Sequence, residues 1–229
     1  MTSSDFEKYW RAQFASSIEA VAGSRVREQI MGKSELPLSG PDRSGDIQWT
    51  VHAMQRLEHL LDREACIDIM TRCSCQYPKG ELQDAKIAYK ETGDITEAHQ
   101  ILQKKFILFL RRTLGLEDDI IDTIVTRGWG LAGVLKDDAI IATKIPKSGF
   151  LREYLAERDP DKKRALYCHC PRVRSILAAR DAVLSPTYCY CGGGFYKGIW
   201  EEILGRDVRV ELHKTVMQGH DVCQFKVVF

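Results

Sequence analysis

The feature of this 229-residue sequence that most limits its fold is a change in the spacing of apolar residues near residue 128. Upstream, apolar residues recur every three or four positions, the spacing that places side chains on one face of a helix. Phe6, Trp10, Phe14, Ile18 and Val21 form the first such series. Downstream, "GVLKDDAIIATKI" (133–145) is typical of a short β-hairpin with two aspartates at its turn. We therefore expect a helical part followed by a part that contains strands.

These patterns predict an α+β fold, in which a helical N-terminal region packs on a C-terminal antiparallel-sheet domain with helices. The expected boundaries are 1–128 for the mainly helical region and 129–229 for the α+β domain. An exposed loop is predicted at 33–46, where Pro, Gly, Ser and Asp gather, and a charged turn at 157–164. Helices are predicted at about 47–70 (with or without a break), 80–91, 95–114, 117–127, 148–157 and 194–205 and after Pro171, and strands at 207–216 and 221–229.

Composition and charge exclude several classes of protein. The net charge of +1 lacks the basic surplus of most nucleic-acid-binding domains. No apolar run approaches the roughly 20 residues that cross a bilayer. The first residues, "MTSSDFEKYWRAQF", are charged and lack the apolar segment of a signal peptide. We expect a cytoplasmic protein whose partners are neither nucleic acid nor membrane.

The cysteines are unusual in both number and placement. Six of the eight fall in three Cys-x-Cys pairs, whereas Cys66 and Cys223 stand apart. In a reducing compartment structural disulfides are uncommon, so clustered cysteines indicate metal binding or redox chemistry. The pairs are Cys73 with Cys75, Cys168 with Cys170, and Cys189 with Cys191.

The two C-terminal pairs are predicted to meet. If "CHC" and "TYCYC" are extended, both thiols of each pair project to one face of the strand. Eighteen residues separate the pairs, enough for a helix that brings them side by side. Thiolates are ligands that zinc and iron–sulfur clusters prefer, although an extended pair spreads its sulfurs about 6 to 7 Å and must bend to hold one ion. The predicted metal ligands are Cys168, Cys170, Cys189, Cys191 and Cys223.

Thiol chemistry and simple packing are alternatives at the same cysteines. Three glycines, 192–194, follow Cys191 and precede a predicted helix, where they permit positive φ angles and a close backbone approach. The start of a helix lowers the pKa of a thiol, so Cys191 is the candidate nucleophile if the protein is an enzyme. A tight turn without any ligand explains these glycines equally well. Cys223 shares its face of the last strand with Phe225 and Val227, where a small buried hydrophobe is equally natural.

A ligand pocket is a further hypothesis for the same stretch. Aromatic side chains and a glycine gather after the "CYC" pair, and such residues commonly line a site for a planar or hydrophobic ligand. The predicted ligand- or cofactor-binding residues are Tyr190, Gly193, Phe195 and Trp200. A packing layer between helix and sheet is the alternative.

The stretch "CGGGFYKGIWEEILGRDVRVELHKTVMQGHDVCQFKV" (191–227) resembles the C-terminal half of the 4-vinyl-reductase domain family. The shared features are a helix that ends in Leu204-Gly205, a strand from Val208, and a hairpin that contains Gly219 and Cys223. "YCHCP" and "SPTYCYCGGG" are similar to an uncharacterised cysteine-rich bacterial and archaeal family with this domain. Amino-thiazoline carboxylate hydrolase-like proteins form a more distant branch. The resemblance covers roughly the last sixty residues.

The resemblance implies a zinc site. Several small-molecule-sensing members hold zinc through a cysteine before the helix, an acidic and a cysteine residue on the next strand, and the hairpin cysteine. Carried over, this implies Cys189 or Cys191 together with Cys223, and Glu211 lies nearest the acidic position. Members of the family often dimerise, so the resemblance also implies a homodimer.

One position departs from the family pattern. Lys214 and Thr215 occupy the region of the strand cysteine. We hypothesise that Cys168 or Cys170 substitutes for it.

The expected function is metal binding, small-ligand binding, or both, through the C-terminal Cys-x-Cys pairs. Zinc is the first expectation and an iron–sulfur cluster the second. A thiol- or metal-dependent hydrolase or reductase, with Cys191 or a cysteine-bound metal at its active site, is the alternative. A structural or assembly module is a third reading. The sequence does not identify the ligand, and it does not decide whether Cys73 and Cys75 join the site.

Overall fold

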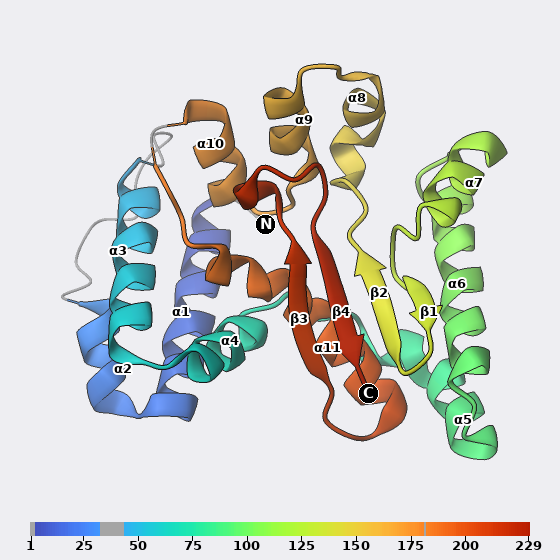
Figure 1. Ribbon diagram of the computed structural model, residues 1–229, viewed down its shortest axis with the longest axis horizontal. Coiled ribbons are helices and arrows are strands. Elements are labelled where there is room, and N and C mark those ends of the chain that lie inside the picture. Colours follow the sequence, from blue (N-terminus) through green and yellow to red (C-terminus); the bar gives the residue numbers. More distant parts are fainter. Residues whose placement is uncertain (1–2, 33–43, 181) are drawn as a thin grey trace.

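The computed structural model describes residues 3–32, 44–180 and 182–229, and it confirms the α+β fold class. In these residues, helices lie at both sides of one four-stranded antiparallel sheet and behind it (Figure 1). Its strands are β1 (Val134–Lys136), β2 (Ala139–Thr143), β3 (Arg209–Lys214) and β4 (Gln224–Val228). Their order across the sheet is β1-β2-β4-β3, so β4 pairs with both β2 and β3.

The N-terminal half is helical, as predicted. The helical stretch predicted at 47–70, for which a break was left open, is two helices, because the Asp62 side chain accepts a hydrogen bond from Ala65 N and caps a new helix there. The predicted loop at 33–46 lies outside the described residues up to residue 43. The helices are α1 (Ser3–Ala22), α2 (Ser24–Met31), α3 (Ser44–Leu60), α4 (Arg63–Arg72), α5 (Gln83–Thr92), α6 (Ile95–Arg112) and α7 (Asp118–Thr126).

The described part of the C-terminal half contains four helices that lie beside the strands. They are α8 (Leu151–Ala156), α9 (Pro160–Tyr167), α10 (Pro171–Ala179) and α11 (Tyr190–Leu204), and a 3₁₀ turn, η3 (Pro186–Cys189), leads into α11. The charged turn predicted at 157–164 is partly wrong, because its second half begins α9. Asp159 caps that helix and proline occupies its first position, which are both strong helix-start signals.

Helix α11 is the centre of the molecule. It packs on β3 and β4 on one side and against α4 and α5 on the other. Glycines 192–194 let the sheet and α4 come close to the backbone of α11. A Cβ on Gly193 would lie 2.7 Å from Val210 Cγ1 of β3, and a Cβ on Gly194 would lie 1.9 Å from the Thr71 backbone oxygen of α4. None of the three has a positive φ. The prediction of a glycine turn is therefore wrong, and these glycines lie inside a helix that its neighbours approach closely.

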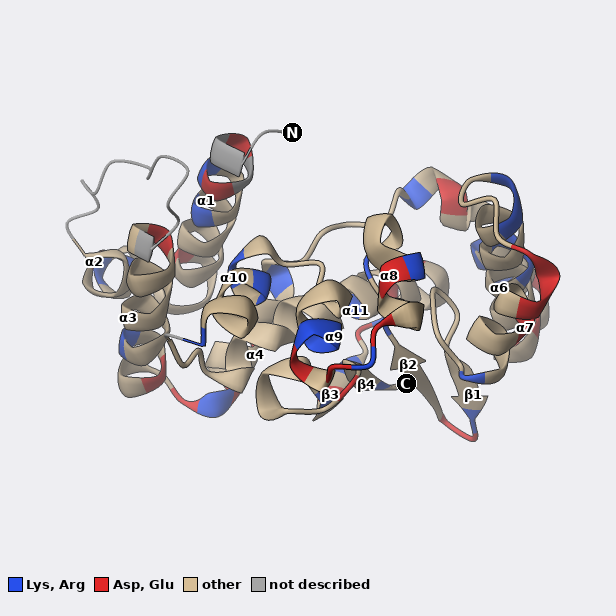
Figure 2. Cartoon of the chain, turned by 90° about the horizontal axis from the view of Figure 1, so that it is seen from above, with Lys and Arg blue, Asp and Glu red and all other residues tan. Residues whose placement is uncertain are grey.

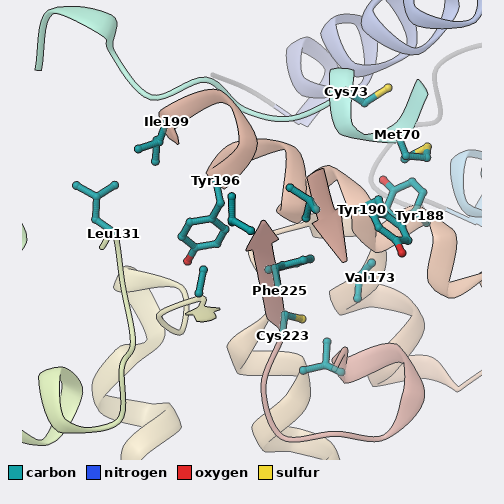
Figure 3. Packing of buried hydrophobic residues seen from close by; sticks show 14 of the residues in the cluster. Met70, Cys73, Leu131, Val173, Tyr188, Tyr190, Tyr196, Ile199, Cys223 and Phe225 are labelled. Carbon is teal, nitrogen blue, oxygen red and sulfur yellow. The ribbon is translucent and has the colours of Figure 1, made fainter. Parts of the chain in front are cut away.

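A single buried hydrophobic cluster includes residues from both predicted regions of the chain. Figure 3 shows its centre, where Tyr196 of α11 faces Phe225 of β4, with 5.9 Å between their ring centroids. The last strand alternates as predicted, since Cys223, Phe225 and Val227 are all buried. Trp200, which is fully buried, packs edge-on against Phe229.

The surface carries both signs of charge. In Figure 2, basic and acidic residues are interspersed over the helices. Within the described residues, no helix combines the length and the apolar character needed to cross a bilayer.

Candidate metal centre

Five cysteines from three separate segments line one small cavity of about 40 Å³. Cys168 and Cys170 come from the turn between α9 and α10, and Cys189 and Cys191 from the start of α11. Cys223 comes from the residue before β4, and Figure 3 shows it beside Phe225 on the inner side of that strand. The structure thus brings together all five residues that the sequence singled out as metal ligands.

The conformation of the pairs agrees with the prediction only in part. Cys168 directly follows α9 and Cys170 is the N-cap of α10, and both have extended backbone angles. Cys189 instead ends η3, and Cys191 lies in the first turn of α11. The predicted extended conformation is therefore wrong for Cys189 and Cys191, whereas Cys168 and Cys170 are extended on either side of a bend at His169. Pro186 opens η3, and this local helix-start signal outweighs the alternation of residue types before α11.

The segment before α11 is tied to the N-terminal helices. Ser185 Oγ and Thr187 Oγ1 both donate hydrogen bonds to Glu58 Oε1 on α3, each at 2.5 Å. Ser185 Oγ also accepts from Thr187 N. These bonds fix the entry of η3 and hence the position of Cys189.

Two further polar residues of the cavity wall hold its shape. The Tyr167 hydroxyl accepts from Cys223 N at 2.9 Å and donates to Lys144 O at 2.5 Å, so it joins α9 to β4 and to the end of β2. His169 Nε2 lies 2.9 Å from Ile145 O, and because a carbonyl only accepts, that ring nitrogen carries the proton. The Nε2 atom of His169 is therefore occupied by a hydrogen bond to the backbone.

Burial raises the pKa of several of these thiols. It is the largest cause for Cys168, Cys189, Cys191 and Cys223, and electrostatic repulsion from another cysteine is the second for the first three. The Lys144 ammonium acts in the opposite direction on the pKa of Cys191 and Cys223. These thiols are therefore neutral near pH 7 unless a cation stabilises their thiolates.

The same balance bears on the nucleophile hypothesis. The pKa of Cys191 is raised, first by desolvation and second by electrostatic repulsion from Cys170. The expectation of a lowered pKa at Cys191 is therefore wrong. A neutral thiol is a poor nucleophile, so the raised pKa of Cys191, which is partly buried, does not favour it as an attacking group.

The size of the cavity limits what it can hold. A water molecule needs roughly 10–15 Å³ of such space, and pockets for organic ligands measure about 300–1,000 Å³. About 40 Å³ is therefore room for an ion or a few water molecules, and it is far smaller than the pockets that hold organic ligands. Among the described residues, no three His, Cys, Asp or Glu side chains already form a metal-binding arrangement. An ion would require the cysteine side chains to turn toward it.

The residues predicted to bind a ligand lie elsewhere. Gly193 packs against the sheet, Trp200 lies in the core, and Phe195 contacts Tyr77 and Tyr196 edge-on. Tyr190 lines an open groove of about 880 Å³ between α4 and β3. The structure does not bring these four residues to the cysteine cavity.

The remaining cysteines also lie outside the cavity. Cys66 is buried, and its Sγ lies 3.6 Å from Leu57 O. Cys73 is buried at the end of α4, where its Sγ lies 3.2 Å from Ile69 O, and burial raises its pKa to about 12. Cys75 is exposed.

A model of a family of unknown function (DUF6144) matches residues 162–229 of the chain. The matched segment contains all five cysteines of the cavity. No curated protein and no solved structure matches the chain.

Proposed function

We propose that this protein binds a single soft metal ion, zinc before any other, through sulfurs of the five cysteines that line the cavity. The observation that carries the proposal is the convergence of five sulfurs from three distant segments on a space of ionic size. Packing alone does not require five thiols in one place, and thiolate sulfur is a preferred ligand of zinc.

Three features support zinc over the alternatives. An iron–sulfur cluster contains several metal and sulfide atoms and needs more room than about 40 Å³. Burial holds the thiols neutral, and a bound cation is the natural means of deprotonating them. The zinc-binding 4-vinyl-reductase-like domains that the sequence resembles also bind zinc through a cysteine before the helix and through the hairpin cysteine. The corresponding residues here are Cys189 and Cys223.

The proposal predicts the metal content of the protein purified without oxygen. We expect close to one zinc per chain by elemental analysis, and no visible absorption. Cys189→Ser should lose most of the metal, because it removes one of the five sulfurs that line the cavity. Cys66→Ala is the matched control, since Cys66 is equally buried but lies outside the cavity, and it should keep the metal.

Other outcomes are informative. Visible sulfur-to-iron absorption together with stoichiometric iron would show that the protein binds an iron–sulfur cluster instead of zinc. A metal-free protein with one rapidly alkylated thiol would overturn metal binding and support the thiol-dependent enzyme instead.

A further inference from the structure

Two hydroxyl groups contact sulfurs of the cavity, one for each Cys-x-Cys pair. Tyr188 Oη lies 3.3 Å from Cys170 Sγ, and Thr215 Oγ1 lies 3.2 Å from Cys189 Sγ. Both hydroxyl-bearing residues are fully buried, at 0% exposure. In the part of the chain that the structure describes, no hydroxyl makes such a contact with Cys168 or Cys191. The two sulfurs of each pair therefore have different surroundings.

The direction of the Tyr188 hydrogen bond follows from its other partner. Arg172 Nη1 lies 3.1 Å from Tyr188 Oη, and a guanidinium only donates. The phenolic oxygen thus accepts from Arg172, and its single proton is free to point at Cys170 Sγ. Arg172 is itself held in place, since it forms a buried ion pair with Glu7 and lies 4.1 Å from the centre of the Trp10 ring.

The Thr215 hydroxyl is oriented in the same way. Its oxygen accepts from Met217 N at 2.9 Å, as the cap of a 3₁₀ turn (Val216–Gln218). The hydroxyl proton is therefore directed at Cys189 Sγ, at 3.2 Å, and the same side chain also interacts with Cys223. Two unrelated parts of the fold, a buried arginine and a backbone amide, produce the same result at two sulfurs.

We propose that Tyr188 and Thr215 are positioning residues that hold Cys170 and Cys189, one sulfur from each pair, as ligands of the bound metal. Hydrogen bonds from neutral donors to a thiolate stabilise its charge and fix its direction, and such outer partners orient metal ligands in proteins. This inference rests on the proposed function. Neither residue belongs to a metal-binding motif, and no spacing in the sequence links Thr215 to Cys189, which are 26 positions apart.

The test compares Tyr188→Phe and Thr215→Val with two matched variants. Tyr196→Phe removes a buried hydroxyl that bonds Gly130 O rather than a sulfur. Thr215→Ser keeps the hydroxyl and the turn cap. Zinc affinity is measured by competition with a chelator, and cobalt(II) serves as a spectroscopic substitute. We expect Tyr188→Phe and Thr215→Val each to bind zinc about 10- to 100-fold more weakly, and Thr215→Ser and Tyr196→Phe to bind like the parent protein.

The cobalt spectrum separates positioning from mere structural support. Loss of a hydrogen bond raises the energy of the sulfur lone pairs, so the sulfur-to-cobalt charge-transfer band should move to lower energy in Tyr188→Phe and Thr215→Val only. If the parent protein binds metal and these two variants match it in affinity and spectrum, the positioning role is overturned while the proposed function stands. If the parent protein binds neither zinc nor cobalt, both are overturned.

Discussion

Replacing Gly194 with alanine is expected to remove a large share of the folding stability, a loss of roughly 3 kcal/mol or more. The added Cβ would lie 1.9 Å from the Thr71 backbone oxygen and 2.6 Å from the Thr71 carbonyl carbon. Both atoms belong to the backbone near the end of α4, so no side-chain rotation can relieve the overlap. Helix α11 would have to move away from α4, and the start of α11 carries Cys189 and Cys191.

Gly198→Ala is the matched control in the same helix. Its Cβ would meet only Gln76 Oε1, at 3.2 Å, and that side chain is flexible. Alanine is a better helix former than glycine by about 1 kcal/mol, so this variant should be as stable as the parent or slightly more so. Urea unfolding followed by circular dichroism measures both. Equal stability of the two variants would show that α4 and α11 are not in the tight contact described above.

The second large effect is expected at the buried ion pair between Arg172 and Glu7, whose exposures are 0% and 2%. Arg172→Met should destabilise the protein by about 3–5 kcal/mol, because it leaves the Glu7 carboxylate buried without its cation. The double variant Glu7→Leu with Arg172→Met should lose less than Arg172→Met alone, since no unpaired charge then remains.

Arg174→Met is the control for this pair. Arg174 lies on the same helix but is only partly buried, with its guanidinium over the Phe150 ring, so its loss should cost about 1 kcal/mol or less. Unfolding is measured with a chelator present, so that metal binding does not contribute to the free energy. A double variant that is less stable than Arg172→Met would contradict the charge argument and assign the loss to packing alone.

The features that could be predicted from the sequence are those set by neighbouring residues. The β1–β2 hairpin follows from its alternation and from Asp137, which has a positive φ of 48° at the turn. Helices α5, α6 and α7 follow from their three- and four-residue spacing. The convergence of the five cysteines was also predicted, because clustering along the chain and the inner face of the last strand both point to it.

The features that could not be predicted depend on contacts between distant parts of the chain. Glu7 and Arg172 are 165 positions apart, and nothing local marks either residue as buried. The same holds for Gly194 and Thr71. The helical conformation of Cys189 and Cys191 was missed for a different reason, because the helix-start proline Pro186 lies just before this pair and determines the backbone there.

The position of β4 within the sheet has a consequence for the order of assembly. A ribosome delivers β1, β2 and β3 before β4, yet β4 is the strand that joins β2 to β3. Until it emerges, the two strands have no common partner and the sheet is two disconnected pieces. Cys223 immediately precedes β4, so the fifth sulfur arrives together with that missing strand. Completion of the sheet and closure of the sulfur-lined cavity are therefore one event, and they come at the end of synthesis of this segment.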